Sequence, residues 1–88
     1  MRFMVSLTLA VPPERQADMP TLRAAEDAHV TGQIQRGNLE GLFIEAATDH
    51  PPSIWAVVRA DSLEEAQRQV AEYPLFPFFS QIRYSALR

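Results

Sequence analysis

Residues 73–79, Tyr-Pro-Leu-Phe-Pro-Phe-Phe, constrain the fold more than any other stretch of this chain. Each of the two prolines fixes its own φ and disfavours helical backbone at the residue before it. We therefore expect Tyr73 and Phe76 to lie outside helices. The segment also carries one leucine and three phenylalanines, and exposing such side chains forfeits about 1.5–3 kcal/mol each. The sequence therefore predicts a stiff, buried corner between two elements.

Hydrophobic patterning predicts four strands and two helices in the order β-α-β-β-α-β. Residues 2–10 alternate between apolar and polar side chains, as a strand with one buried face does. The first expected helix is capped by Asp18, has Pro20 in its first turn and ends near Arg36, where Gly37-Asn38 stops it. Strands Leu39 to Ala47 and Ile54 to Ala60 follow and are joined as an antiparallel hairpin. A Ser62–Glu65 capping box then opens the second helix, and the last strand runs from Phe78 to Ala86. This order is the ferredoxin-like α+β fold, a four-stranded antiparallel sheet with both helices on one face. We expect residues 1–88 to form a single domain.

The third expected strand is apolar on both of its sides. Its sequence Ile54-Trp55-Ala56-Val57-Val58 offers no polar face to water, which is typical of strands buried on both faces. The helices cover only one face of a ferredoxin-like sheet, so something must cover the other. Because two-fold dimers are the commonest assembly, we expect a homodimer or a higher homo-oligomer.

Composition excludes several classes of function. The chain has no cysteine, and all eight of its basic residues are arginine, which excludes thiolate chemistry, lysine Schiff bases and a P-loop. A net charge of −3 with scattered arginines argues against a nucleic-acid partner. No apolar run is long enough for a membrane span and no leader opens the chain. We expect a cytoplasmic protein with no membrane partner, no metal site and no cofactor.

Glu26 is the main candidate for chemistry. The expected apolar sector of the first helix comprises Met19, Leu22, Val30 and Ile34. Glu26 falls near the middle of that sector at 100° per residue, with His29 and Gln33 beside it. If Glu26 faces a cavity, partial burial raises its pKa and suits it to general acid–base work. Alternatively, the helix rolls slightly and Glu26 lies at the boundary or pairs with an arginine.

Other polar and aromatic residues are secondary candidates. His29 lies one helical turn from Glu26, so it could share a proton with the carboxyl or merely satisfy it. His50 beside Asp49, and Glu45 and Arg83 on strands, are explained by turn polarity and a solvated face. The aromatic residues are mainly expected in the core, although some could line a pocket for a flat apolar ligand.

The segment Tyr73-Pro74-Leu75-Phe76-Pro77-Phe78 resembles the Leu-Pro-Leu-Phe-Pro-Tyr stretch of muconolactone isomerases. The resemblance extends from about Arg23 to Tyr84, and Arg23-Ala24-Ala25-Glu26 matches the basic-Ala-Asp-Glu sequence of the family except for the aspartate. It implies a dimeric α/β barrel that works without a cofactor and holds Glu26 in a pocket, with Arg23 as a substrate-binding residue. Glu40 and Ile44 stand where the family has arginines, so muconolactone itself is not the expected substrate.

Two functional hypotheses follow. The first is a cofactor-independent enzyme that isomerises or cyclises a small cyclic or polyketide-like substrate, with Glu26 moving the proton and His29 orienting it or sharing that proton. Trp55, Phe76 and Phe79 would hold the apolar body of the substrate. The alternative is a non-catalytic ligand-binding or assembly module with the same fold. A cavity beside Glu26 would favour the enzyme, and a Glu26–arginine ion pair would favour the module.

Overall fold

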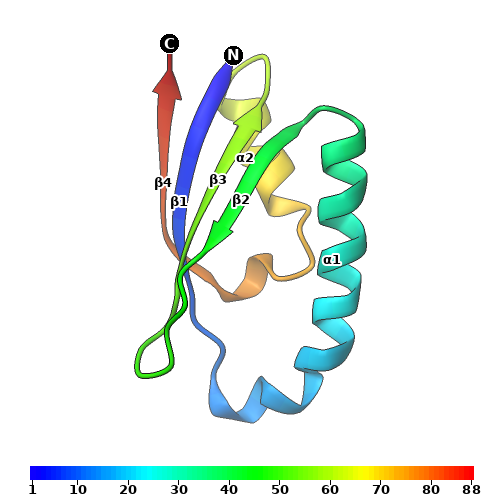
Figure 1. The fold of residues 1–88 in the computed structure, drawn as a ribbon, viewed down its shortest axis with the longest axis vertical. Helices are drawn as coiled ribbons and strands as arrows, with labels where there is room; N and C mark the ends of the chain where they lie inside the picture. Colours follow the sequence, from blue (N-terminus) through cyan, green and yellow to red (C-terminus); the bar gives the residue numbers. More distant parts are fainter.

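The computed structural model describes residues 1–88 (Figure 1). Its elements are β1 (Arg2–Leu9), the 3-10 helix η1 (Pro13–Asp18), α1 (Met19–Gln35), β2 (Leu39–Ile44), β3 (Ser53–Arg59), α2 (Leu63–Ala71), the 3-10 turn η2 (Phe76–Phe78) and β4 (Phe79–Leu87). The strands form one antiparallel sheet in the order β2-β3-β1-β4. Both helices lie on the same side of that sheet (Figure 1). The predicted ferredoxin-like α+β fold is confirmed.

The core lies between the sheet and the helices, and strand register selects its members. Phe3 pairs with Val58, Val5 with Ala56 and Leu7 with Ile54, and all six side chains are buried. Paired residues in antiparallel strands place their side chains on the same face. The alternation of residues 2–10 is therefore confirmed as a buried apolar face.

The β2–β3 connection begins earlier than expected. β2 ends at Ile44 rather than at Ala47, although the Glu45 N–H still donates to the Ser53 carbonyl at 2.9 Å. Pro51 and Pro52 follow in the connection, and neither proline can donate a hydrogen bond to extend the ladder. The expected extension of the strand to Ala47 is therefore wrong.

The start of α1 also differs from the expectation. Asp18 is helical rather than extended, and its side chain makes no capping hydrogen bond. Its carboxylate instead accepts a hydrogen bond of 2.8 Å from Arg15. The cause is η1, which runs straight into α1 and takes away the extended backbone that an N-cap residue needs. Pro20 does lie in the first turn, as predicted.

The end of α1 follows the sequence closely. Gly37 has a φ of 78°, its N–H donates to the Ile34 carbonyl, and the Asn38 N–H donates to the Gln33 carbonyl, both at 3.0 Å. These two bonds form a Schellman motif, which uses a left-handed glycine to satisfy the last carbonyls of a helix. The predicted helix end at Gly37-Asn38 is confirmed.

The inner face of α1 is more polar than expected. Ile34 is 51% exposed, whereas Gln33 is buried at 6%. The Gln33 amide oxygen accepts a hydrogen bond of 3.0 Å from the Asn38 amide, which makes burial of this polar side chain tolerable. The predicted placement of Ile34 in the buried sector is therefore wrong, and Gln33 is the buried residue instead.

α2 and the proline corner close the core. The Ser62 hydroxyl accepts a hydrogen bond of 3.1 Å from the Glu65 N–H, so Ser62 is confirmed as the cap. The Glu65 carboxylate accepts from Arg68 and Gln69 instead, so the reciprocal half of the predicted capping box does not form.

In the corner, Leu75 and Phe78 are buried and Tyr73 lies outside the helices. Phe76, however, begins the 3-10 turn η2, because the Phe78 N–H donates to the Leu75 carbonyl at 2.9 Å and the Phe79 N–H donates to the Phe76 carbonyl. Pro77 disfavours helical backbone at Phe76, but this is a preference that local hydrogen bonds can override.

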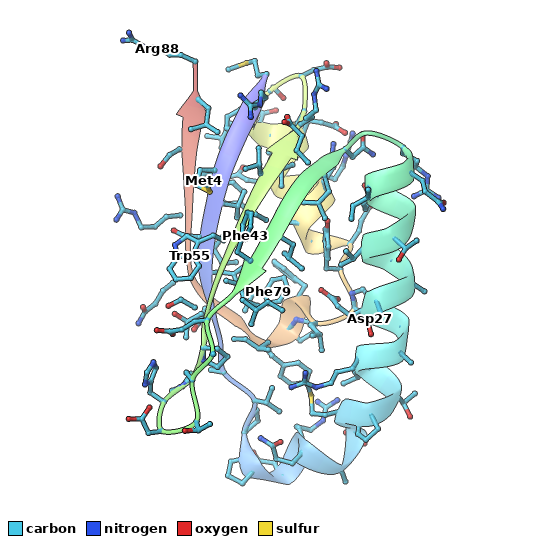
Figure 2. The ribbon with its side chains drawn as sticks, in the orientation of Figure 1. Met4, Asp27, Phe43, Trp55, Phe79 and Arg88 are labelled. Carbon is cyan, nitrogen blue, oxygen red and sulfur yellow. The ribbon has the colours of Figure 1, made fainter.

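The face of the sheet opposite the helices carries large apolar side chains. Phe43 pairs with Trp55 across β2 and β3, and they are 64% and 40% exposed. Met4 pairs with Val57 on this same face. Phe43, Trp55 and Met4 are labelled in Figure 2. We call these four side chains the open-face patch. Neither helix combines the length and the hydrophobicity that a membrane-spanning helix requires.

Candidate functional site

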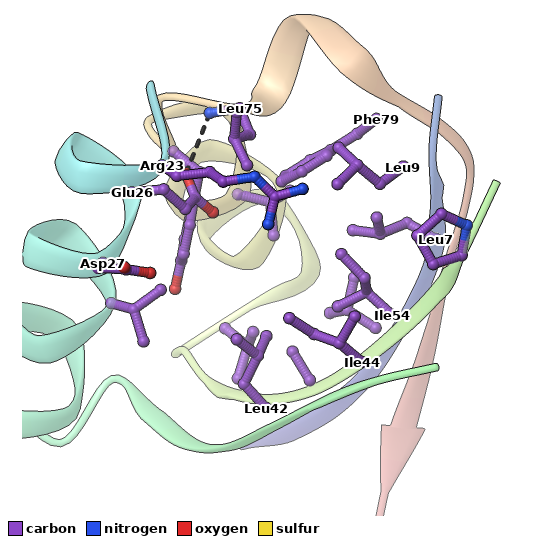
Figure 3. A pocket seen from close by; sticks show the side chains of 17 residues that line it. Leu7, Leu9, Arg23, Glu26, Asp27, Leu42, Ile44, Ile54, Leu75 and Phe79 are labelled. Atoms are coloured by element: carbon purple, nitrogen blue, oxygen red, sulfur yellow. Dashed lines mark hydrogen bonds between the residues drawn. The ribbon is translucent and has the colours of Figure 1, made fainter. Parts of the chain in front are cut away.

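A cavity of about 160 Å³ opens between α1, the proline corner and the helix-facing side of the sheet (Figure 3). Seventeen residues line it, and thirteen of them are hydrophobic. Leu7, Leu42 and Ile54 belong to the sheet side of the cavity, and Leu75 and Phe79 to the corner side. The few polar groups in this lining therefore determine what chemistry the cavity can support.

Glu26 is one of those polar groups. One of its carboxylate oxygens accepts a hydrogen bond of 3.0 Å from the Leu75 N–H (Figure 3). Burial raises the pKa of Glu26 above its ordinary value, the neighbouring charge of Asp27 adds to the rise, and the Leu75 hydrogen bond opposes it. A carboxyl with a raised pKa, fixed at one oxygen and facing an apolar cavity, is suited to proton transfer.

Arg23 lines the cavity one turn before Glu26. Figure 3 shows its guanidinium reaching over the cavity. Neither Arg23 nor Glu26 takes part in any of the six ion pairs of the structure. The observation that separates the two hypotheses thus favours the first, since a cavity opens beside Glu26 and no arginine forms an ion pair with it.

Tyr73 is a lining residue that sequence reasoning did not select. Burial, and secondarily the charge of Glu26, raise the pKa of its phenol to about 12. The available signal was the resembling motif itself, because Tyr73 stands where the family sequence begins with leucine. An aromatic side chain in a buried corner is equally typical of a core residue, so residue type alone does not identify Tyr73 as a cavity residue.

His29 does not reach the cavity lining. Its ring packs edge-on against Tyr73, with centroids 4.5 Å apart and an interplanar angle of 69°. No hydrogen bond joins it to Glu26, and its Nε2 atom is buried without a partner. The structure thus brings His29 to Tyr73 rather than to the Glu26 carboxylate.

The three aromatic candidates occupy different places. Phe79 lines the cavity, and Phe76 does not. Phe76 packs edge-on against Phe79 with centroids 6.1 Å apart, so it supports the wall from outside the lining. Trp55 belongs to the open-face patch, because it alternates with the buried residues Ile54 and Ala56. The sheet therefore separates Trp55 from Glu26.

The remaining candidates lie away from the cavity. His50 contacts Asp49 at 2.7 Å and Glu45 at 3.1 Å in the β2–β3 connection. The Ser53 N–H also donates to Glu45, and this bond, followed by that of His50, lowers the pKa of Glu45. These contacts among Glu45, Asp49 and His50 hold the β2–β3 turn together. The structure contains no group of three His, Cys, Asp or Glu side chains arranged to bind a metal ion.

Comparison with solved structures supports the fold assignment. A crystal structure of muconolactone isomerase is similar over 99% of this chain and 88% of that one, with a TM-score of 0.78 and 24% identity. The 5-chloro-2-hydroxyhydroquinone dehydrochlorinase TftG from Burkholderia phenoliruptrix AC1100, in complex with 2,5-dihydroxybenzoquinone, is similar over 100% of this chain and 94% of that one, with a TM-score of 0.70 and 16% identity. No protein-family model and no curated protein sequence matches the chain. The chain therefore has the muconolactone isomerase-like fold that its corner motif predicted.

Proposed function

We propose that this protein is a small, cofactor-independent enzyme that moves a proton on a small cyclic substrate, in an isomerisation or a cyclisation. The observation that carries the proposal is the Glu26 carboxylate, half-buried beside an apolar cavity and not paired with any cation. A base in such a place keeps its proton affinity high and is shielded from competing water.

The reaction needs one base and an acidic C–H bond. The Glu26 carboxylate takes a proton from a carbon next to a carbonyl group, and the electron pair of that C–H bond forms an enolate. The resulting carboxylic acid returns the proton to another carbon of the same delocalised system. No electrons are gained or lost overall, so the chain's own side chains are sufficient for this chemistry.

The dimensions of the cavity favour a substrate with one ring. A volume of about 160 Å³ is close to the roughly 150 Å³ of an engineered apolar cavity that binds benzene. The enzymes named in the two similar structures, an isomerase and a dehydrochlorinase with a bound dihydroxybenzoquinone, are consistent with a small ring compound. The Arg23 guanidinium at the cavity would attract an anionic group on such a ring.

We also propose that the protein is a homodimer joined through the open-face patch. Phe43 and Trp55 expose large apolar side chains next to one another, and a second copy of the same patch would remove both from water. A two-fold axis through this face would make the contact self-complementary.

The alternative, a binding module without catalysis, keeps one supporting observation. The Glu26–Leu75 hydrogen bond would hold the corner in place even if no reaction occurred. Such a module would bind ring compounds in the same cavity and would leave their C–H bonds unchanged, which is an outcome that experiment can distinguish.

The test is enzyme-dependent exchange of carbon-bound hydrogen for deuterium. A panel of single-ring ketones, lactones and hydroxyquinones, with and without a carboxylate, is incubated with the protein in D₂O and followed by NMR. We expect exchange on at least one compound, slowed on the order of 10²-fold or more in Glu26→Gln. Glu14→Gln, which changes an exposed residue of η1, is the matched control. Equal exchange rates in wild type and Glu26→Gln would remove Glu26 as the base.

A further inference from the structure

Tyr73 is a cavity-lining residue whose hydroxyl group has no role in the proposed proton transfer by Glu26. Tyr73 begins the proline corner and lines the same cavity as Glu26. Its ring is held from the side by His29, with centroids 4.5 Å apart. None of the side-chain hydrogen bonds of the structure involves the phenol oxygen. Tyr73 is thus a positioned donor that has no partner in the protein.

The protonation states of the two groups are complementary. Burial and the Glu26 charge raise the pKa of Tyr73 to about 12, so the phenol keeps its proton at neutral pH. The cavity therefore holds one group that accepts a proton and another that donates a hydrogen bond. Proton abstraction beside a carbonyl requires this combination, because negative charge develops on the carbonyl oxygen as the proton leaves the carbon.

A purely structural role does not explain the hydroxyl. Phenylalanine would pack the same ring against His29 without bringing a polar atom into a largely apolar cavity wall. The only fully buried side-chain polar atom without a partner is His29 Nε2, so the phenol oxygen of Tyr73 remains accessible to a ligand. A ligand oxygen would supply the missing partner.

We propose that Tyr73 is a catalytic residue whose hydroxyl donates a hydrogen bond to the substrate carbonyl oxygen while Glu26 removes the neighbouring proton. This inference rests on the proposed function of Glu26. The C–H bond breaks, its electron pair forms a C=C bond, and the carbonyl π pair moves to the oxygen that Tyr73 holds. The proton stays on Glu26 until it returns to carbon, and Tyr73 keeps its own proton throughout.

The pair of groups also defines the class of substrate. The substrate is a single-ring carbonyl compound with a C–H bond next to the carbonyl, oriented so that its oxygen meets Tyr73 and that hydrogen meets Glu26. An anionic substituent on the ring would extend toward the Arg23 guanidinium, which reaches over the cavity (Figure 3).

The test uses 4-nitrophenolate as a stable mimic of the enolate. It is performed in the Glu26→Gln protein, because its neutral amide imitates the protonated carboxyl that accompanies the enolate. Binding is followed by the absorbance of the probe, and nitrobenzene, which has the same ring but no phenolate oxygen, is the matched ligand. Tyr84→Phe is the matched variant, since Tyr84 packs on the core from β4 and does not line the cavity.

We expect Tyr73→Phe to weaken 4-nitrophenolate binding about tenfold or more, as loss of a hydrogen bond to a charged group does. Nitrobenzene binding should stay unchanged, and Tyr84→Phe should alter neither. Equal phenolate affinity with and without the Tyr73 hydroxyl would overturn the proposal, as would phenolate binding no tighter than that of nitrobenzene. Because the measurement involves no turnover, its result is separate from the deuterium-exchange test of Glu26.

Discussion

The Glu26 carboxylate accepts a 3.0 Å hydrogen bond from the backbone N–H of Leu75, a residue 49 positions later in the chain. This single contact joins the middle of α1 to the proline corner. It fixes one carboxylate oxygen and leaves the other to the cavity, and it also satisfies a backbone donor at a residue that is only 6% exposed. The proposed chemistry and the packing of the corner therefore depend on the same side chain.

The two roles of Glu26 can be separated by substitution. Glutamine keeps an oxygen that can accept from Leu75 and carries no charge to desolvate, so Glu26→Gln should be at least as resistant to urea as the wild type. Glu26→Ala leaves a buried N–H without a partner, and we expect it to lower the free energy of unfolding by about 1–3 kcal/mol. Urea unfolding of both variants, with Glu14→Ala as a surface control, measures the difference. Equal stability of Glu26→Ala and Glu26→Gln would show that the bond does not hold the corner.

The raised pKa of Glu26 predicts how stability depends on pH. Between its ordinary value of 4.5 and its raised native value, the folded state binds more protons than the unfolded state, so this residue makes stability fall as pH rises through that window. Glu40 and Glu45 act in the opposite sense, because their lowered pKa values make stability fall as pH drops below 4.5. Melting temperatures from about pH 4 to about pH 7 should therefore show a decline in wild type that Glu26→Gln reduces. A decline of the same size in that variant would contradict the assignment.

The open-face patch predicts an obligate assembly. We expect a homodimer that buries more than about 1,200 Å² in total. Replacing Trp55 by glutamate places a charge in the apolar contact and should give a monomer in sedimentation experiments at micromolar concentration. Ile34→Glu, at an exposed helix position on the other side of the molecule, should leave the assembly unchanged. A folded wild-type monomer at that concentration would refute the predicted dimer.

The proline corner predicts an order among core substitutions. Leu75 and Phe78 are buried, and Phe76 is only partly buried. Leu75→Ala should lower the free energy of unfolding by about 2–5 kcal/mol and Phe78→Ala by about 3–5 kcal/mol. Phe76→Ala should cost less than Phe78→Ala, because part of its ring is already in water. Calorimetric or urea unfolding ranks the three, and a larger loss at Phe76 would contradict the observed packing.

The sequence was sufficient for the fold because local signals and topology agree. The alternation of residues 2–10 and the left-handed Gly37 each specify a feature without help from distant residues. Asp18 failed as a cap because Arg15 and the preceding 3-10 helix compete for it. Gln33 is buried where Ile34 was expected, because the Asn38 amide donates a hydrogen bond to the Gln33 side chain. Helix periodicity alone does not reveal such a partner.

The candidate site was only partly predictable. The position of Glu26 followed from helix periodicity, since the carboxyl falls on the face that turns toward the core. Trp55 was grouped with Phe79 by residue type, although the two-residue period of β3 places it beyond the sheet. The place of Tyr73 in the cavity lining could not be predicted from the sequence, because only the tertiary structure brings the residues after α2 against the middle of α1.

The polar inner face of α1 limits how far this protein can be stabilised without loss of function. Glu26, His29 and Gln33 occupy positions that leucine would fill with more burial and no desolvation penalty. A consensus or computational redesign would replace them first and would gain thermal stability. Each such gain would remove the proposed base Glu26, the contact of His29 with Tyr73, or the hydrogen bond between Gln33 and Asn38 at the helix end. Selection for stability and selection for activity should therefore diverge most strongly along this one helix face.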